Sequence, residues 1–137
     1  MTIQLSVAVR NAMLDAIEAA IGTAAIIKLR SGAQPANCAA ADAGTVIATI
    51  ALASDWMGNA SAGSKAFSST PLTDTSADNT GTLAHYRVYA SDGTTCGMQG
   101  TITATGGGGD MTVDNTSVIS GQTINITSWT VNMNGHA

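Results

Sequence analysis

The chain has 137 residues, a length typical of one domain, and its 45% hydrophobic content excludes an intrinsically disordered protein. Only 10% of the residues are charged, the net charge is −4, and no basic run exists, which argues against a nucleic-acid-binding protein. The 24 Ala, 19 Thr and 15 Gly residues predict a thin core of small side chains, so we expect subunit contacts to supply part of the stability.

The first residues contain neither a basic segment nor a long apolar run, which argues against a secretory signal and a transmembrane helix. We therefore expect the chain, a single domain over 1–137, to fold in a reducing cytoplasm. In that compartment Cys38 and Cys96 are expected to be thiols, with a disulfide between them as the alternative.

An N-terminal helix is predicted over residues 6–21. Ser6 is suited to cap its start and Gly22 its end. Apolar residues recur every four positions at Val9, Met13, Ile17 and Ile21, which predicts that this stripe is buried. The stripe would pack either on the body of its own domain or on a neighbouring subunit.

A β body is predicted over residues 23–137, because Thr, Val and Ile replace Ala as the chain proceeds. Residues 23–30 form a strand with Ala25, Ile27 and Leu29 on one face. Residues 31–44 form a loop, and residues 45–53 a strand that is apolar on both faces and therefore central. Residues 58–81 are expected to form a long loop, with Phe67 and Leu72 as possible anchors.

The stretch from 83 to 102 predicts a hairpin with a three-residue loop over 91–93, where Gly93 takes the left-handed conformation. This register pairs Val88 with Cys96 and Tyr86 with Met98, and it places all four on one buried face. His85 and Arg87 then lie on the opposite, solvated face. Replacement of Arg87 by Ala is accordingly expected to cost no more than about 0.5 kcal/mol.

Turn residues and short strands continue to the end of the chain. Residues 106–109 are four glycines, interpreted as a flexible hairpin connection rather than a phosphate loop, because no Lys-Ser or Lys-Thr follows them. In the last strand, 123–133, the apolar residues stand at even-numbered positions before Thr127 and at odd-numbered positions after Ser128. This change of face predicts a β-bulge there. The pattern is typical of a mostly β protein: an antiparallel β-sandwich or jelly-roll-like fold with one N-terminal α-helix.

The sequence predicts no enzymatic activity, no cofactor and no metal. Neither histidine occurs in a metal-binding or catalytic motif, and Asp110 with Asp114 lacks the spacing and closing Glu of an EF-hand loop. The large side chains suggest protein contacts instead, since Trp and Arg are favoured in interfaces. The candidate interface residues are Trp56, Met57, Arg87 and Trp129, although core positions are an alternative for both tryptophans.

Four stretches of the sequence resemble a family of small virion proteins from tailed-phage and prophage genomes: AVRNAMLDAIEAAIG, PANCAAADAGT, SDWM at 54–57, and GGGGDMTVDNTSVISGQTINITSWT. The resemblance covers most of the chain apart from residues 60–80. It implies a capsid decoration (cement) protein on the virion surface, bound to the major capsid protein and to itself as a dimer or trimer, with no nucleic-acid or membrane partner. The alternatives are a tail or head fibre module that binds a host surface, and a cytosolic phage accessory protein.

Overall fold

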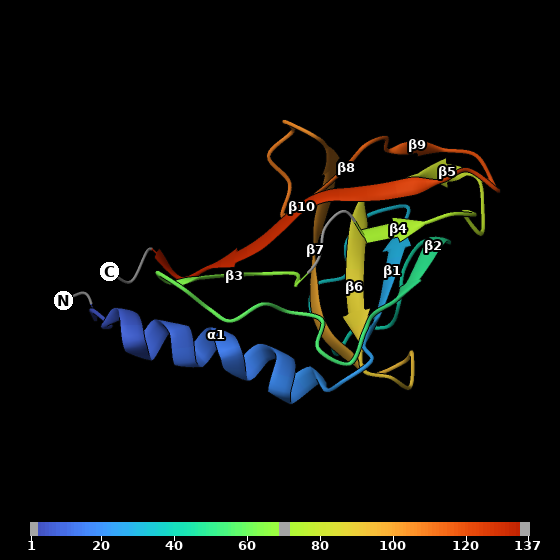
Figure 1. Cartoon of the computed structure of the whole chain (residues 1–137). Coiled ribbons are helices and arrows are strands. Elements are labelled where there is room, and N and C mark those ends of the chain that lie inside the picture. Colours follow the sequence, from blue (N-terminus) through green and yellow to red (C-terminus); the bar gives the residue numbers. More distant parts are fainter. Residues whose placement is uncertain (1–2, 69–71, 135–137) are drawn as a thin grey trace.

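A computed structural model describes residues 3–68 and 72–134, in which one α-helix packs against a curled β-sheet (Figure 1). The elements in chain order are α1 (Val7–Ile21), β1 (Ile26–Arg30), β2 (Val46–Ala51), β3 (Ser64–Ala66), β4 (Leu72–Asp74), β5 (Gly81–Thr82), β6 (His85–Tyr89), β7 (Cys96–Ala104), β8 (Met111–Val113), β9 (Ser117–Val118) and β10 (Ile124–Asn132). The predicted mostly β, sandwich-like architecture with an N-terminal helix is confirmed.

The main sheet has eight strands in the order β2-β1-β6-β7-β8-β10-β3, with β4 paired to another part of β10. All pairs are antiparallel except β7 with β8, so the sheet is mixed. β10 is long and crosses the direction of β1, β6 and β7 (Figure 1). The sheet therefore curls around its own core, while β5 and β9 form a separate two-stranded ribbon.

The predicted apolar face is buried: Ile27 and Leu29 of β1, and Ala25 just before it, are fully buried. The predicted central position of the next strand is wrong, because β2 lies at one end of the strand order. Its outer edge is covered by the segment around β4: the Asp74 carboxylate accepts a hydrogen bond from the Thr49 N–H at 3.1 Å. The Asp74 side chain and the segment around β4 thus occupy the edge of β2 where the sequence predicted a second neighbouring strand.

The helix predicted over residues 6–21 is found over Val7–Ile21, with Ser6 as its cap and the predicted end. The Ser6 Oγ accepts a hydrogen bond from the Val9 N–H at 3.3 Å, which caps the first turn. Gly22 ends the helix with φ of +98°, and its N–H donates to the Glu18 carbonyl at 2.8 Å. A residue with a Cβ is strained at this φ, so glycine is favoured there.

The predicted buried stripe on α1 is wrong for its first two members. Val9 and Met13 are 45% and 48% exposed, whereas Arg10 and Leu14 are buried. The helix docks partly through long polar side chains, because the Arg10 guanidinium reaches the Met133 carbonyl at 3.4 Å. Such contacts rotate the helix relative to the orientation that hydrophobic spacing alone predicts.

The segment 58–81, predicted as a loop, contains β3 and β4 and ends at β5. β3 pairs with the end of β10, with Val131 opposite Lys65. Phe67 is buried as an anchor, as expected, and Leu72 is half-buried. The predicted loop thus supplies short strands to two parts of the same edge of β10, the edge opposite β8.

The predicted hairpin register is wrong. Val88 pairs with Met98 and Tyr86 with Gly100, while a bulge at Gly97 shifts Cys96 opposite Tyr89. Asp92 widens the turn, because its carboxylate accepts hydrogen bonds from the N–H groups of Thr94 and Thr95, both at 2.8 Å. Gly93 has φ of +69°, as predicted, and Tyr86 and Val88 are buried.

The bulge predicted in the last strand is confirmed, since the β10–β8 register shifts between Ile126 and Ser128. The four glycines do not form a hairpin: they connect β7 to the parallel strand β8. The return is tight, because a Cβ on Gly107 would lie 2.7 Å from the Thr103 Cβ. Gly107 is therefore required for close packing, whereas Gly106 and Gly108 have φ of +87° and +81°, a conformation that favours glycine.

Candidate interaction site

A groove of about 390 Å³ lies between β7 and β10. Its lining residues are Tyr86, Met98, Gln99, Asp110, Trp129, Thr130, Val131 and Asn132. Neighbours such as Met98 and Gln99 point to opposite faces of a strand, and both line the groove. The groove therefore lies in the plane of the sheet, where β8 would continue if it began before Met111.

One side of the groove is closed by Tyr86, which bridges the gap from β6. Its ring lies over Gly100, since a Cβ there would sit 2.7 Å from the Tyr86 hydroxyl oxygen. That hydroxyl accepts a hydrogen bond from the Trp129 indole N–H at 2.6 Å, so it joins β6 to β10 across β7. Burial raises the pKa of Tyr86 to about 12, so the phenol remains a neutral hydrogen-bonding group.

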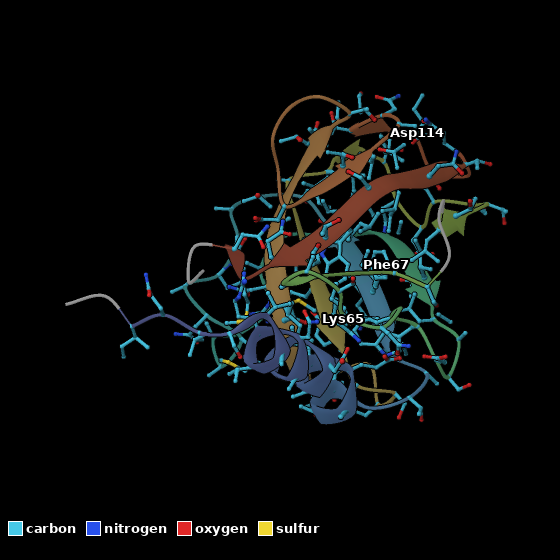
Figure 2. The ribbon with its side chains drawn as sticks, turned by 60° about the vertical axis from the view of Figure 1, so that its left-hand side comes forward. Lys65, Phe67 and Asp114 are labelled. Carbon is cyan, nitrogen blue, oxygen red and sulfur yellow. The ribbon has the colours of Figure 1, made fainter. Side chains whose placement is uncertain are left out.

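Two further aromatic contacts extend from this bridge toward the helix. Phe67 stacks on Trp129 with ring centroids 4.3 Å apart, and Trp56 lies 6.3 Å from Phe67. Phe67 lies beneath β10 in the interior (Figure 2). Four of the five aromatic side chains are thus in one cluster, which gives the small-residue core its largest buried surface.

The four candidate interface residues are all buried, so Trp56 and Trp129 take the alternative core position, whereas the solvated position expected for Arg87 is wrong. Trp56 and Met57 are each 2% exposed, Arg87 2% and Trp129 3%. The Trp56 indole N–H donates to the Gly22 carbonyl at 3.0 Å, and its backbone N–H to the Glu18 carboxylate at 2.8 Å. These side chains make contacts within their own chain, so an interface with another molecule must be formed by other residues.

Arg87 belongs to a polar network beneath loop 31–44. Asp42 accepts hydrogen bonds from Arg87 at 2.6 Å, Tyr89 at 2.7 Å and Arg30 at 2.7 Å. Arg87 also donates to the Asn37 carbonyl at 2.8 Å. The loop therefore covers the face of β1 and β6 that the sequence assigned to solvent.

The ionisation of Asp42 is coupled to this network. Burial alone would raise the pKa of Asp42, but hydrogen bonds from Tyr89 and Arg87 and the charge of Arg30 outweigh it, so the pKa lies below its ordinary value. Sequence reasoning missed the network because its donors and acceptor lie more than ten residues apart. One signal in the sequence pointed to such a network: Lys28 and Arg30 are two residues apart, so two cations lie on the same outer face of β1.

His85 is fully buried, which corrects the prediction of a solvated histidine. Its Nδ1 lies 2.9 Å from the Gly32 carbonyl, so the neutral ring donates there. Nε2 is buried without a hydrogen-bond partner. Burial lowers the pKa of His85, and nearby Arg30 and Arg87 act in the same direction.

The two cysteines are free thiols in the structure and lie side by side, with Sγ atoms 2.7 Å apart. The bulge at Gly97 turns Cys96 toward loop 31–44, where Cys38 lies. Burial raises the pKa of the Cys96 thiol to about 12, and the neighbouring Cys38 thiol adds to the effect. Cys96 is therefore protonated, and correspondingly unreactive, near neutral pH.

Lys65 attaches α1 to the sheet. Its ammonium group donates to the Asp15 carboxylate at 2.8 Å and to the Gly58 carbonyl at 2.9 Å, and it lies 3.8 Å from the Glu18 carboxylate. Figure 2 shows Lys65 between the helix and the strands. The hydrogen bond from Lys65 and that from the Ala60 N–H lower the pKa of Asp15. These ionic contacts occupy the inner side of the helix.

The outer side of α1 is apolar. Its exposed positions on one face are Ala8, Val9, Ala12, Met13, Ala16, Ala19 and Ala20. Of the five exposed large hydrophobic side chains in the described part of the chain, four lie within residues 3–13 and the fifth is Ile119. A surface helix normally turns charged residues outward, so this face is typical of a helix that is covered by another molecule.

The two aspartates considered for calcium have other partners. Asp110 accepts hydrogen bonds from the Thr101 N–H and hydroxyl, both at 2.8 Å, and Asp114 accepts from the Asn125 amide at 2.7 Å. Asp114 lies at the far end of β10 from the helix (Figure 2). Within residues 3–68 and 72–134, no group of three His, Cys, Asp or Glu side chains is placed to hold a metal ion.

None of the helical segments among the described residues is long and apolar enough to cross a membrane. Comparison with known proteins gave no matching family model, curated protein or solved structure.

Proposed function

We propose that this chain is a structural protein of a tailed-phage virion, a capsid decoration protein that binds the lattice of the major capsid protein. The observation that carries the proposal is the apolar outer face of α1, with Val9 and Met13 about half exposed. An uncharged helix face on a protein with few charged residues is suited to a broad contact with another protein. The resemblance to small virion proteins supplies the identity of that partner.

The absence of charge from the contact face also favours a protein partner over a glycan or a nucleic acid. Glycan sites usually present exposed aromatic rings, whereas Trp56, Trp129 and Phe67 are buried. Tyr86 and Tyr89 are buried as well. For this reason we prefer capsid decoration to the alternative of a fibre module that binds a host surface.

The first test is the copy number and position of the protein in purified virions, measured by mass spectrometry and electron microscopy. Capsid decoration predicts high copy number on the head lattice. Low copy number at the tail tip, or absence from the virion, would refute the proposal.

The second test is attachment of purified protein to capsids that lack it. Met13→Glu keeps a good helix former and places a charge on the outer face, so it should abolish attachment while the melting temperature of the free protein changes little. Ser91→Asp, an exposed change in the hairpin loop, is the matched control and should attach normally. Equal attachment of both variants would exclude the α1 face as the contact.

A further inference from the structure

The groove between β7 and β10 has hydrogen-bonding backbone on both sides. The Met133 N–H donates to the Gly63 carbonyl, so in the alternating pattern of β10 the backbone groups of Val131 face β3. Those of Thr130 and Asn132 then face the groove. No described residue pairs with β10 on that side beyond Trp129.

The opposite side of the groove is the edge of β7. The Ile102 N–H donates to the Ala84 carbonyl, toward β6, whereas the Thr101 N–H donates away from β6 to Asp110. By the same alternation, the backbone groups of Gln99 face the groove. β8 is hydrogen-bonded to both β7 and β10 from Met111 onward. Among residues 3–68 and 72–134, no strand lies in the line of β8 before Met111.

The groove has one apolar and one polar face, which sets the pattern of a strand that would fill it. Tyr86, Met98, Trp129 and Val131 lie on one face; Gln99, Asp110, Thr130 and Asn132 lie on the other. An inserted strand must therefore alternate apolar and polar side chains. Its charge should be neutral, because the single charged group in the lining, Asp110, already accepts two hydrogen bonds from Thr101.

Residues 3–6 of this chain match these requirements. Ile3 and Leu5 alternate with Gln4 and Ser6, and the segment has no charged side chain. It belongs to no helix or strand, and Ile3 is 72% exposed. It precedes the N-terminal end of α1, which lies away from β1, β2 and β6 (Figure 1).

We propose that residues 3–6 of a second copy insert into the groove as an extended strand and pair with the edges of β7 and β10. Ile3 and Leu5 would contact the face formed by Tyr86, Met98, Trp129 and Val131. Gln4 would lie on the side of Thr130 and Asn132. This exchange joins copies of the chain without a capsid, and it is independent of the proposed function.

The test is site-directed cross-linking in a Cys38→Ser, Cys96→Ser background. One copy carries Gln4→Cys and the other Thr130→Cys or Asn132→Cys. With oxidised glutathione, the two thiols form a disulfide and two molecules of reduced glutathione are released. We expect a cross-linked heterodimer from one of these pairs and none when the second copy carries Ser91→Cys. The double variant on a single chain should likewise cross-link between chains; a cross-linked monomer would overturn the proposal in favour of insertion within one chain.

Light scattering on the otherwise unmodified chain gives a second measurement that needs no cysteine changes. We expect an oligomer at tens of micromolar, and a monomer with unchanged circular dichroism for Ile3→Asp, whose side chain is largely free in the isolated chain. Gln4→Asp is the control, because it adds the same charge on the polar face and should dissociate the oligomer much less. A monomeric parent protein, or an oligomer unaffected by Ile3→Asp, would overturn the proposal.

Discussion

Replacement of Arg87 by Ala tests whether loop 31–44 is held on the sheet by the Asp42 network. Arg87 is 2% exposed and donates to Asp42, Gln99 and the carbonyls of Asn37 and Ala40. Breaking a buried ion pair typically costs 3–5 kcal/mol, and the lower end applies because the Asp42 side chain is 40% exposed. We therefore expect Arg87→Ala to lower the free energy of unfolding by about 3 kcal/mol.

The assay is urea denaturation followed by tryptophan fluorescence, together with the thermal midpoint. For a domain of this length, a loss of about 3 kcal/mol corresponds to a decrease of about 10 °C. The matched control is Lys28→Ala, which removes the same charge from the residue paired with Arg87 across β1 and β6. Lys28 makes one hydrogen bond, to the Gly93 carbonyl, and a cation–π contact with Tyr89, so its loss should cost about 1 kcal/mol.

The same network predicts a dependence on pH. The pKa of Asp42 is lower in the folded chain than in the unfolded chain, so its ionisation stabilises the fold above about pH 4, and this stabilisation is lost as the pH falls through the folded value. Asp42→Asn should remove that part of the acid dependence. If Arg87→Ala instead costs no more than about 0.5 kcal/mol, the network contributes little and Arg87 behaves as the solvated residue expected from the sequence.

Three further predictions follow from buried groups elsewhere in the chain. Gly100→Ala should lower the free energy of unfolding by about 1–3 kcal/mol in urea denaturation and alter the tryptophan emission, because the added Cβ would displace the Tyr86 ring. Gly58→Ala is the control and should cost much less, since no atom would lie closer than 3.9 Å to its Cβ. The Cys38→Ser, Cys96→Ser double variant should keep its circular dichroism spectrum; loss of the fold, with an intact mass two daltons low before reduction, would show that a disulfide is essential. Since the pKa of His85 is lower in the folded chain, its burial as a neutral ring should make stability fall as the pH drops below about 6.5, and His85→Gln should show a weaker decline between pH 7 and 5.

Local features of the fold were predictable because neighbouring residues determine them. The caps at Ser6 and Gly22 need only a hydroxyl and a left-handed residue at the right spacing. The bulge near Thr127 follows from a change in parity along one strand. The buried face of β1 follows from simple alternation.

The features that sequence reasoning missed depend on segments far apart in the chain. Asp42 lies 45 residues before Arg87, so no local pattern indicated that a loop would neutralise and bury that charge. The bulge at Gly97 was not predictable, because the apolar residues on either side of it do not change from odd to even positions as they do in β10. The groove could not be predicted either, because it results from β8 beginning at Met111 while its neighbours extend further.

The position of β10 has a consequence for how the protein folds during synthesis. This last strand pairs with β3, β4 and β8, which lie in three separate parts of the chain. Until residues 124–132 leave the ribosome, those three strands have no common partner and their apolar residues remain accessible. Long-range pairing of this kind slows folding, typically to milliseconds or seconds. The β body is therefore expected to acquire its native packing only after residues 124–132 have been synthesised, and until then chaperones can bind the exposed strands.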